Sequence, residues 1–230
     1  MFGESIGRGA KRIIDALVDW LAYGGVHPNV LTFIGLAINC VCGLLFGFGQ
    51  FFWAGVVLIV ANLFDMLDGN VARRSGLVTR YGAFLDSSLD RLSDMVAFVG
   101  IMFFYATNTP QRSMLNVFLA GVGLMFSVMV SYTSARAESL IPKCDVGFLR
   151  RPERIVLLII GALTTIPESN NFFLNRMPAV LWILAIAGVW TFIQRMIYTW
   201  REVEKLDAAP GAETEREVLR TTQTGHTLAR

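Results

Sequence analysis

The chain has 230 residues, 54% of them hydrophobic and 17% charged, and a mean hydropathy of +0.52. Soluble domains are about 45–50% apolar and about 25% charged. The composition therefore excludes a disordered, collagen-like or disulfide-based chain and disfavours a soluble globule. The net charge of +2 gives no reason to expect a nucleic-acid partner. Because long apolar runs recur through the first 200 residues, we predict an integral membrane protein.

Residues 5–23 have the pattern of a basic amphipathic helix. Apolar residues recur at helical spacing along one side, and charged residues occupy the other. Such a helix ahead of a span is typical of the membrane interface, with Trp20 and Tyr23 at the depth of the headgroups. We therefore expect residues 1–25 to form an interfacial element.

Apolar segments predict six transmembrane helices after this element. They are placed at about 29–49, 52–74, 82–106, 112–138, 153–168 and 177–201. The expected fold is thus an all-α integral membrane protein, with a six-helix membrane domain over residues 26–206. Residues 207–230 turn abruptly polar, and we expect a mobile tail there.

Basic residues gather on one side of the predicted spans. This side carries Arg8, Lys11, Arg12, Arg73, Arg74, Arg80, Lys143, Arg150, Arg151, Arg154, Arg201 and Lys205. The opposite loops contain only Arg112 and Arg176. By the positive-inside rule, both termini face the cytoplasm, and the chain is a multi-pass protein of the cytoplasmic (inner) membrane.

Four aspartates lie within the second and third predicted spans. These are Asp65, Asp68, Asp86 and Asp90. An aspartate at the centre of a span costs on the order of 3 kcal/mol, so a compensating positive charge is expected. Each pair shares a stripe with small residues on its own helix, and the short connection predicts that the two helices are antiparallel neighbours with facing stripes. Carboxylates around such a hollow favour Mg²⁺, Mn²⁺ or Ca²⁺ over zinc.

Two other roles for these aspartates remain open from the residue pattern alone. A cation-coupled transporter would use them as its ion site, but inverted repeats and broken helices at the midplane are then expected, and the sequence has neither. Alternatively, lysines or arginines at the helix ends neutralise them. Because the aspartates share their stripes with glycines and Arg73, a ligand-binding cradle is the favoured interpretation.

The spacing of eight residues resembles the motif of the CDP-alcohol phosphotransferase family. It runs Asp65-x2-Asp68-Gly69-x2-Ala72-Arg73-x8-Gly82-x3-Asp86-x3-Asp90. The resemblance implies an enzyme in which an alcohol displaces CMP from a CDP-linked donor, with two Mg²⁺ or Mn²⁺ ions. It implies that Asp65, Asp68 and Asp86 are metal ligands, and that Asp90 shares the metal site and acts as the general base. It also implies a homodimer.

Similarity to the family further assigns a nucleotide pocket. The implied donor-binding residues are Asn29, Thr32, Asp68, Gly69, Ala72, Arg73 and Gly82, with Arg73 pairing with phosphate. Without the resemblance, Asn29 and Thr32 indicate only the start of a helix. The compact length and the basic loops favour CDP-diacylglycerol with a small polar acceptor over a CDP-headgroup attacked by a lipid alcohol.

Residues 131–138 and 151–154 resemble the corresponding segments of phosphatidylinositol-phosphate synthases of actinobacteria and their archaeal relatives. The resemblance implies that Arg136, Arg154 and Arg195 bind the phosphate of inositol phosphate. Ser134 departs from the pattern, because those enzymes commonly carry Lys or Arg two places before Arg136. Glycerol phosphate, free inositol or another polyol therefore remains compatible as the acceptor.

Overall fold

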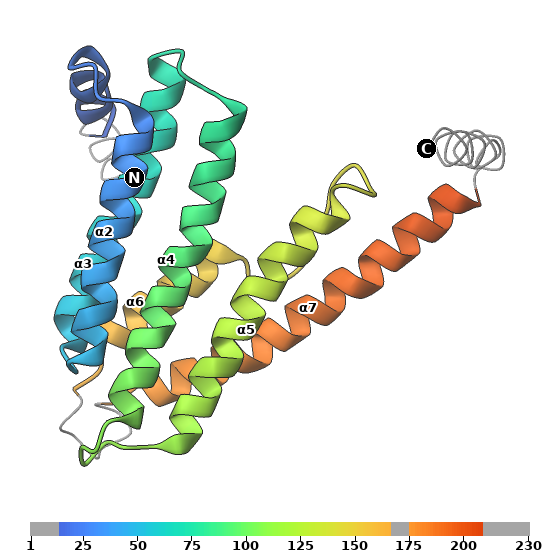
Figure 1. The fold of residues 1–230 in the computed structure, drawn as a ribbon. Coiled ribbons are helices and arrows are strands. Elements are labelled where there is room, and N and C mark those ends of the chain that lie inside the picture. The colour runs from blue at the N-terminus through green and yellow to red at the C-terminus, as the bar shows by residue number, and fades with distance from the viewer. Residues whose placement is uncertain (1–13, 167–174, 209–230) are drawn as a thin grey trace, which may run out of the picture.

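Helices account for all the secondary structure in residues 14–166 and 175–208, which are the residues that the computed structural model describes. After a helical segment at residues 14–23, the elements are α2 (Pro28–Gly47), α3 (Phe51–Arg74), α4 (Arg80–Ala106), α5 (Met114–Ala137), α6 (Arg151–Leu163) and α7 (Met177–Asp207) (Figure 1). The all-α prediction is confirmed. The rest of the predicted interfacial helix and most of the polar tail lie outside the described residues.

Each of the six predicted spans corresponds to one of these helices. By length and composition, four of them, α2, α3, α5 and α7, suffice to cross a membrane within the described part of the chain. α4 has 27 residues but carries charged side chains in its first half. α6 has 13 residues, or about 20 Å at 1.5 Å per residue, which is less than the roughly 30 Å of the hydrocarbon core.

Two helix ends differ from the prediction for local reasons. α6 ends at Leu163 rather than near residue 168, because the residue before Pro167 is disfavoured in a helix. α7 continues to Asp207, and a Lys205–Glu202 ion pair of 2.6 Å supports this additional turn.

The packing order corrects the expectation that α3 and α4 are direct neighbours. α2 packs against both of them, whereas α3 and α4 do not pack closely against each other. Glycines on α2 explain this arrangement. A Cβ on Gly35 would lie 2.9 Å from Oδ1 of Asp65 in α3, and one on Gly43 would lie 2.5 Å from Val96 in α4. α2 thus presents a glycine to each neighbouring helix, which lets both helices approach it closely.

α2 and α4 cross most closely at two glycines. A Cβ on Gly100 would lie 2.1 Å from the carbonyl oxygen of Gly43. Since a methyl group does not fit at that distance, the backbones touch directly at this crossing. Phe46, Phe51 and Phe98 are almost fully buried and belong to the main hydrophobic cluster. This packing holds the first helices in a fixed geometry.

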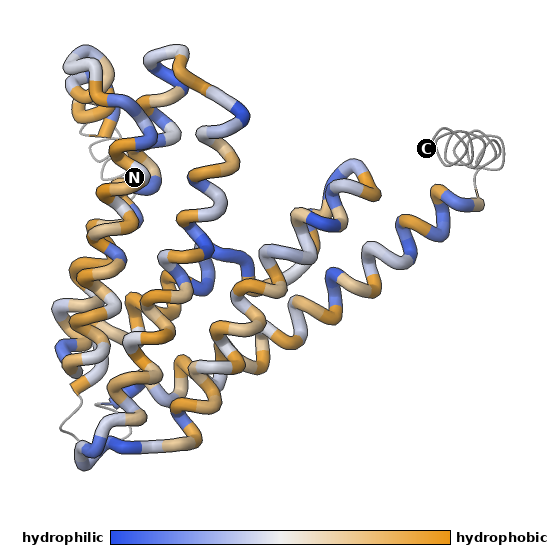
Figure 2. Tube along the Cα trace, viewed as in Figure 1, coloured by the Kyte–Doolittle hydropathy of each residue, from blue (hydrophilic) through white to orange (hydrophobic). Residues whose placement is uncertain are grey.

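The second half of the bundle leans away from the first. α5 packs against α4 and α7, and α6 contacts α3 and α7. The α5–α7 pair diverges from α4 to form a V that opens toward the end carrying residues 14–23 (Figure 1). Figure 2 shows hydrophilic residues at the start of α6, which appears between α4 and α5 in this view. The start of α6 therefore places hydrophilic residues in the angle of the V (Figure 2).

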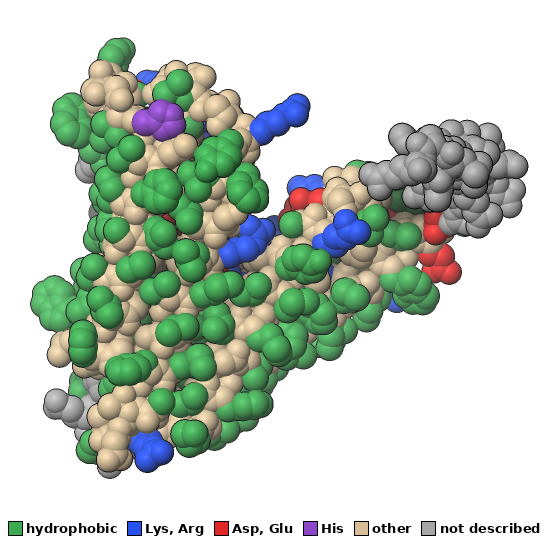
Figure 3. Space-filling view, viewed as in Figure 1, with side chains coloured by type: hydrophobic (Ala, Val, Ile, Leu, Met, Phe, Trp, Pro, Cys, Tyr) green, Lys and Arg blue, Asp and Glu red, His purple; other side chains and the backbone are tan. Residues whose placement is uncertain are grey.

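The surface and the loops have the polarity of a membrane protein. Large exposed apolar side chains, among them Phe33, Trp53, Phe118 and Trp190, cover the long helices, and Figure 3 shows Lys and Arg side chains in the hollow between the two arms. The loops at 75–79 and 138–150 lie at the open end (Figure 1). The basic residues that flank these two loops, at 73–80 and 143–151, therefore share one end of the bundle (Figure 1), whereas Arg8, Lys11 and Arg12 lie outside the described residues.

Candidate active site

A pocket of about 280 Å³ lies where the start of α2, the end of α3 and the start of α4 meet. Its walls contain Pro28, Asn29, Thr32, Asp68, Gly69, Ala72, Arg73, Leu77, Val78, Thr79, Gly82, Ala83 and Asp86. The pocket thus brings together all seven of the residues that the sequence assigns to donor binding. Four lining residues were not predicted. They come from the α3–α4 connection and the first turn of α4, and they are Leu77, Val78, Thr79 and Ala83.

Local capping fixes the two helix starts in this pocket. The backbone N–H of Asn29 donates to Nδ1 of His27 over 3.2 Å, and the N–H of Gly82 donates to Oγ1 of Thr79 over 2.9 Å. A Cβ on Gly82 would lie 3.0 Å from that Thr79 oxygen and 3.6 Å from Oδ1 of Asn29. Because Gly82 has no side chain, it leaves space in the pocket where the two helix starts approach each other.

Asp68 carries a buried carboxylate oxygen that lacks a hydrogen-bond partner. The residue is 4% exposed. Its Oδ1 accepts from the N–H of Gly69, whereas its buried Oδ2 has no hydrogen-bond partner. A buried carboxylate oxygen without a partner costs free energy until a cation or donor reaches it. Asp86 also lines this pocket, and so two of the four predicted metal ligands face the same space.

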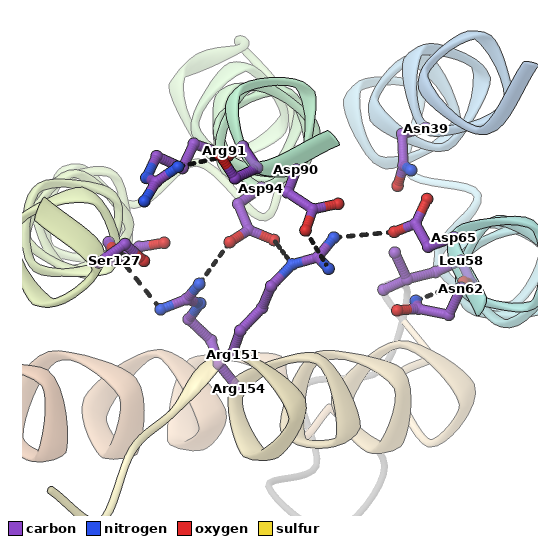
Figure 4. A network of polar contacts seen from close by, with 12 residues as sticks. Asn39, Leu58, Asn62, Asp65, Asp90, Arg91, Asp94, Ser127, Arg151 and Arg154 are labelled. Atoms are coloured by element: carbon purple, nitrogen blue, oxygen red, sulfur yellow. Dashed lines mark hydrogen bonds and ion pairs between the residues drawn. The ribbon is translucent and has the colours of Figure 1, made fainter. Parts of the chain in front are cut away.

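The other two predicted ligands hold Arg151, the first residue of α6. One guanidinium nitrogen lies 2.8 Å from Oδ2 of Asp65 and another lies 2.7 Å from Oδ2 of Asp90. Figure 4 shows the Arg151 side chain reaching from α6 into the space between α3 and α4. The guanidinium therefore supplies the compensating positive charge that aspartates within a span require.

Asp94 adds a fifth carboxylate, which the sequence prediction missed. It forms a buried ion pair with Arg154 and lies 3.9 Å from Nε of Arg151. Arg154 also donates to the backbone carbonyl of Ser127 over 3.5 Å (Figure 4). The signal was present in the sequence, because Asp94 continues the four-residue spacing from Asp86 to Asp90 by one further step on α4.

This site fits divalent cations in its chemistry. All the charged groups that could coordinate an ion here are carboxylates, whose oxygens Mg²⁺ and Mn²⁺ prefer. The unpartnered Oδ2 of Asp68 and the bridging of Asp65 and Asp90 by a guanidinium each indicate a place for positive charge. Within the described residues no three carboxylate, imidazole or thiolate groups converge on one point, because Asp68 and Asp86 face the pocket while Asp65 and Asp90 turn to Arg151.

The three arginines predicted to bind the acceptor phosphate contact different groups. Arg136, at the end of α5, donates to Oγ of Ser139 over 3.3 Å and is exposed. Arg195 is buried; its Nε donates to the carbonyl of Val146 over 2.9 Å, and it also contacts the carbonyl of Val130. Arg154 belongs to the aspartate network. Arg154 and Arg195 thus contact carbonyls about one helical turn apart on α5, and Arg136 lies at the end of the same helix.

The chain matches the family model for CDP-alcohol phosphatidyltransferase over residues 25–201. The chain therefore belongs to the CDP-alcohol phosphatidyltransferase family and is a transferase, as the motif predicted. It is 32% identical to the phosphatidylinositol phosphate synthase of Mycobacteroides abscessus over 92% of this chain and 94% of that protein. It is 36% identical to the archaetidylinositol phosphate synthase of Methanothermobacter thermautotrophicus, over 84% and 92% of the two chains.

The fold is similar to that of a solved relative. The phosphatidylinositol phosphate synthase of Mycobacterium tuberculosis with CDP-DAG bound has a TM-score of 0.74 and 34% identity, covering 87% of this chain and 96% of that chain. The same enzyme in complex with manganese and citrate has a TM-score of 0.72 and 33% identity, over 86% and 91% of the chains. Sequence and fold thus agree on the family.

Proposed function

We propose that this chain transfers a phosphatidyl group from CDP-diacylglycerol to inositol phosphate and releases CMP. The observation that carries this proposal is the pocket between α2, α3 and α4, whose walls contain every residue assigned to donor binding. Relatives named for inositol-phosphate products, and a relative solved with CDP-DAG, support the same donor and acceptor.

In this proposal the pocket holds the nucleotide end of the donor. Gly69 and Gly82 leave room for the nucleotide and its phosphates. Arg73 lines the pocket with its side chain held by Asn70 over 2.9 Å, and its guanidinium is suited to phosphate. Asn29 and Thr32, in the first turns of α2, supply polar groups for the cytidine.

We assign two divalent cations, Mg²⁺ or Mn²⁺, to Asp65, Asp68, Asp86 and Asp90. When bound, such ions neutralise the pyrophosphate and stabilise charge on the attacking and leaving oxygens. Asp90 lies farther along α4 from the nucleotide pocket than Asp86, and it acts as the general base. It accepts the acceptor hydroxyl proton while that oxygen bonds to the phosphatidyl phosphorus and the bond to CMP breaks.

Acceptor recognition is assigned to Arg136, Arg154 and Arg195. Arginine binds phosphate with paired donors, and the buried Nε of Arg154 has no hydrogen-bond partner in the structure.

The basic end of the bundle, with both termini and the active site, faces the cytoplasm in this proposal. The chain lies in the inner membrane among lipids as a homodimer, with residues 1–25 in the interface, 26–206 as the membrane domain and 207–230 as a mobile tail.

A CMP-release assay tests the donor and the acceptor separately. Purified protein is given CDP-diacylglycerol and Mg²⁺ or Mn²⁺ with inositol phosphate, glycerol phosphate, free inositol or no acceptor. We expect release with inositol phosphate. Because Ser134 replaces a basic residue, glycerol phosphate and free inositol are the informative alternatives. Release with one of these alone would overturn the acceptor assignment, and no release with any acceptor would overturn the donor assignment.

A further inference from the structure

Arg151 is the only basic side chain within the described residues that forms ion pairs with two of the predicted metal ligands. It bonds Asp65 of α3 and Asp90 of α4 at 2.8 and 2.7 Å, and so it connects two helices that do not pack closely on each other. Its side chain is 28% exposed. The Arg151 guanidinium is thus a cation held by carboxylates from both aspartate stripes.

A guanidinium and a divalent cation are incompatible at this position. Arginine keeps its charge at any physiological pH, so it cannot relieve repulsion by losing a proton. The Oδ2 atoms of Asp65 and Asp90 that accept hydrogen bonds from Arg151 are the same atoms that would coordinate a metal ion. Occupation of these oxygens by one cation therefore disfavours occupation by the other.

The structure also provides another carboxylate for Arg151. Asp94 lies 3.9 Å from its Nε, one helical turn beyond Asp90, and is not a predicted metal ligand. Nε of Arg151 has no hydrogen-bond partner, so Oδ1 of Asp94 is the nearby carboxylate oxygen toward which the guanidinium can turn. A guanidinium displaced from Asp65 and Asp90 thus remains paired at the edge of the site.

We propose that Arg151 is a built-in counter-cation that competes with divalent metal for Asp65 and Asp90 and moves to Asp94 when metal binds. This inference rests on the metal site of the proposed function. Without metal, Arg151 neutralises the aspartate stripes and holds α6 against α3 and α4. With metal, its departure frees the carboxylates, and so metal affinity reflects the difference between the two states.

Mn²⁺ binding to the full-length detergent-purified protein tests the competition. Free Mn²⁺ is measured by electron paramagnetic resonance for wild type, Arg151→Gln, Arg151→Lys and the matched control Arg150→Gln. Arg150 is the preceding residue, but it pairs with Asp145 at 2.7 Å and not with any of the predicted metal ligands. We expect Arg151→Gln to bind Mn²⁺ about tenfold more tightly, a coupling of ordinary size between ligands of one site, and Arg150→Gln to match wild type.

Thermal denaturation distinguishes competition from a merely structural role. Without metal, Arg151→Gln should melt below wild type, and Mn²⁺ should raise its melting temperature more than that of wild type. Unchanged or weaker Mn²⁺ affinity in a folded Arg151→Gln variant would overturn the proposal. If that variant does not fold, Arg151→Lys decides: its single ammonium should give a smaller gain in affinity, and no gain overturns the proposal.

Wild type and Asp68→Asn separate this proposal from the proposed function. If wild type binds no Mn²⁺, the metal site itself is wrong and both proposals fail. If wild type binds Mn²⁺ and Asp68→Asn does not, the metal site stands, and an unchanged affinity in Arg151→Gln overturns the competition alone.

Discussion

Asp90 faces two demands in the same site, because it is assigned both to metal and to proton transfer. In the structure its carboxylate forms an ion pair with Arg151, and Asp90 does not line the nucleotide pocket. We predict that Asp90→Asn keeps CDP-diacylglycerol binding but lowers the CMP-release rate by about 10²–10⁴-fold, the usual contribution of general acid–base catalysis. Donor affinity and turnover are measured on the same preparation. Loss of Mn²⁺ binding in this variant would instead make Asp90 primarily a metal ligand.

The Asp94–Arg154 pair is the most buried ion pair among the described residues. The two side chains are 9% and 3% exposed. We predict that Asp94→Asn lowers the free energy of unfolding by about 3–5 kcal/mol, because it leaves the Arg154 charge buried without its partner. Denaturation in detergent measures the loss. Replacing both residues, as in Asp94→Leu with Arg154→Met, should recover much of it, and a double variant less stable than Asp94→Asn would contradict this explanation.

At the scale of the elements, the crossing of α2 over α4 depends on Gly43 and Gly100. We predict that Gly100→Ala destabilises the protein by about 1–3 kcal/mol, the range for overpacked sites, since the added methyl group meets the Gly43 carbonyl oxygen. Gly121→Ala is the matched control, because its Cβ would meet only the Met102 methyl group, at 3.7 Å. Melting temperatures of the two variants should differ, and equal values would argue against a tight crossing.

Helix positions followed closely from the apolar pattern, whereas helix packing did not. The short 75–79 connection suggested that α3 and α4 are neighbours, but the glycines of α2 bring that helix against both. The four-residue spacing of Asp86 and Asp90 located one polar stripe of α4. It did not indicate that the start of α6 lies opposite this stripe, because periodicity describes a face of one helix and not its partner.

At the scale of the whole molecule, the basic loops define an orientation that labelling can test. Lys143 lies in the 138–150 loop at the open end of the V, and Asn108 lies in the 107–113 loop at the other end; both are exposed. With native cysteines replaced by alanine, we predict that Asn108→Cys reacts with a membrane-impermeant maleimide in intact cells. Lys143→Cys should react only after lysis, because positively charged loops stay in the cytoplasm. The reverse pattern would invert the topology.

The sequence by itself determined the membrane class, the all-helical fold and the family, and the resemblance to that family assigned the residues for donor binding. Class, fold and family follow from composition, periodicity and the fixed spacing within α3 and α4, which are properties of contiguous chain. Only the tertiary structure decided that Arg151 bonds Asp65 and Asp90, that Asp94 pairs with Arg154, and that Arg154 and Arg195 contact carbonyls of α5. Those contacts join helices distant in sequence, and their partners are set by how small residues let the helices approach.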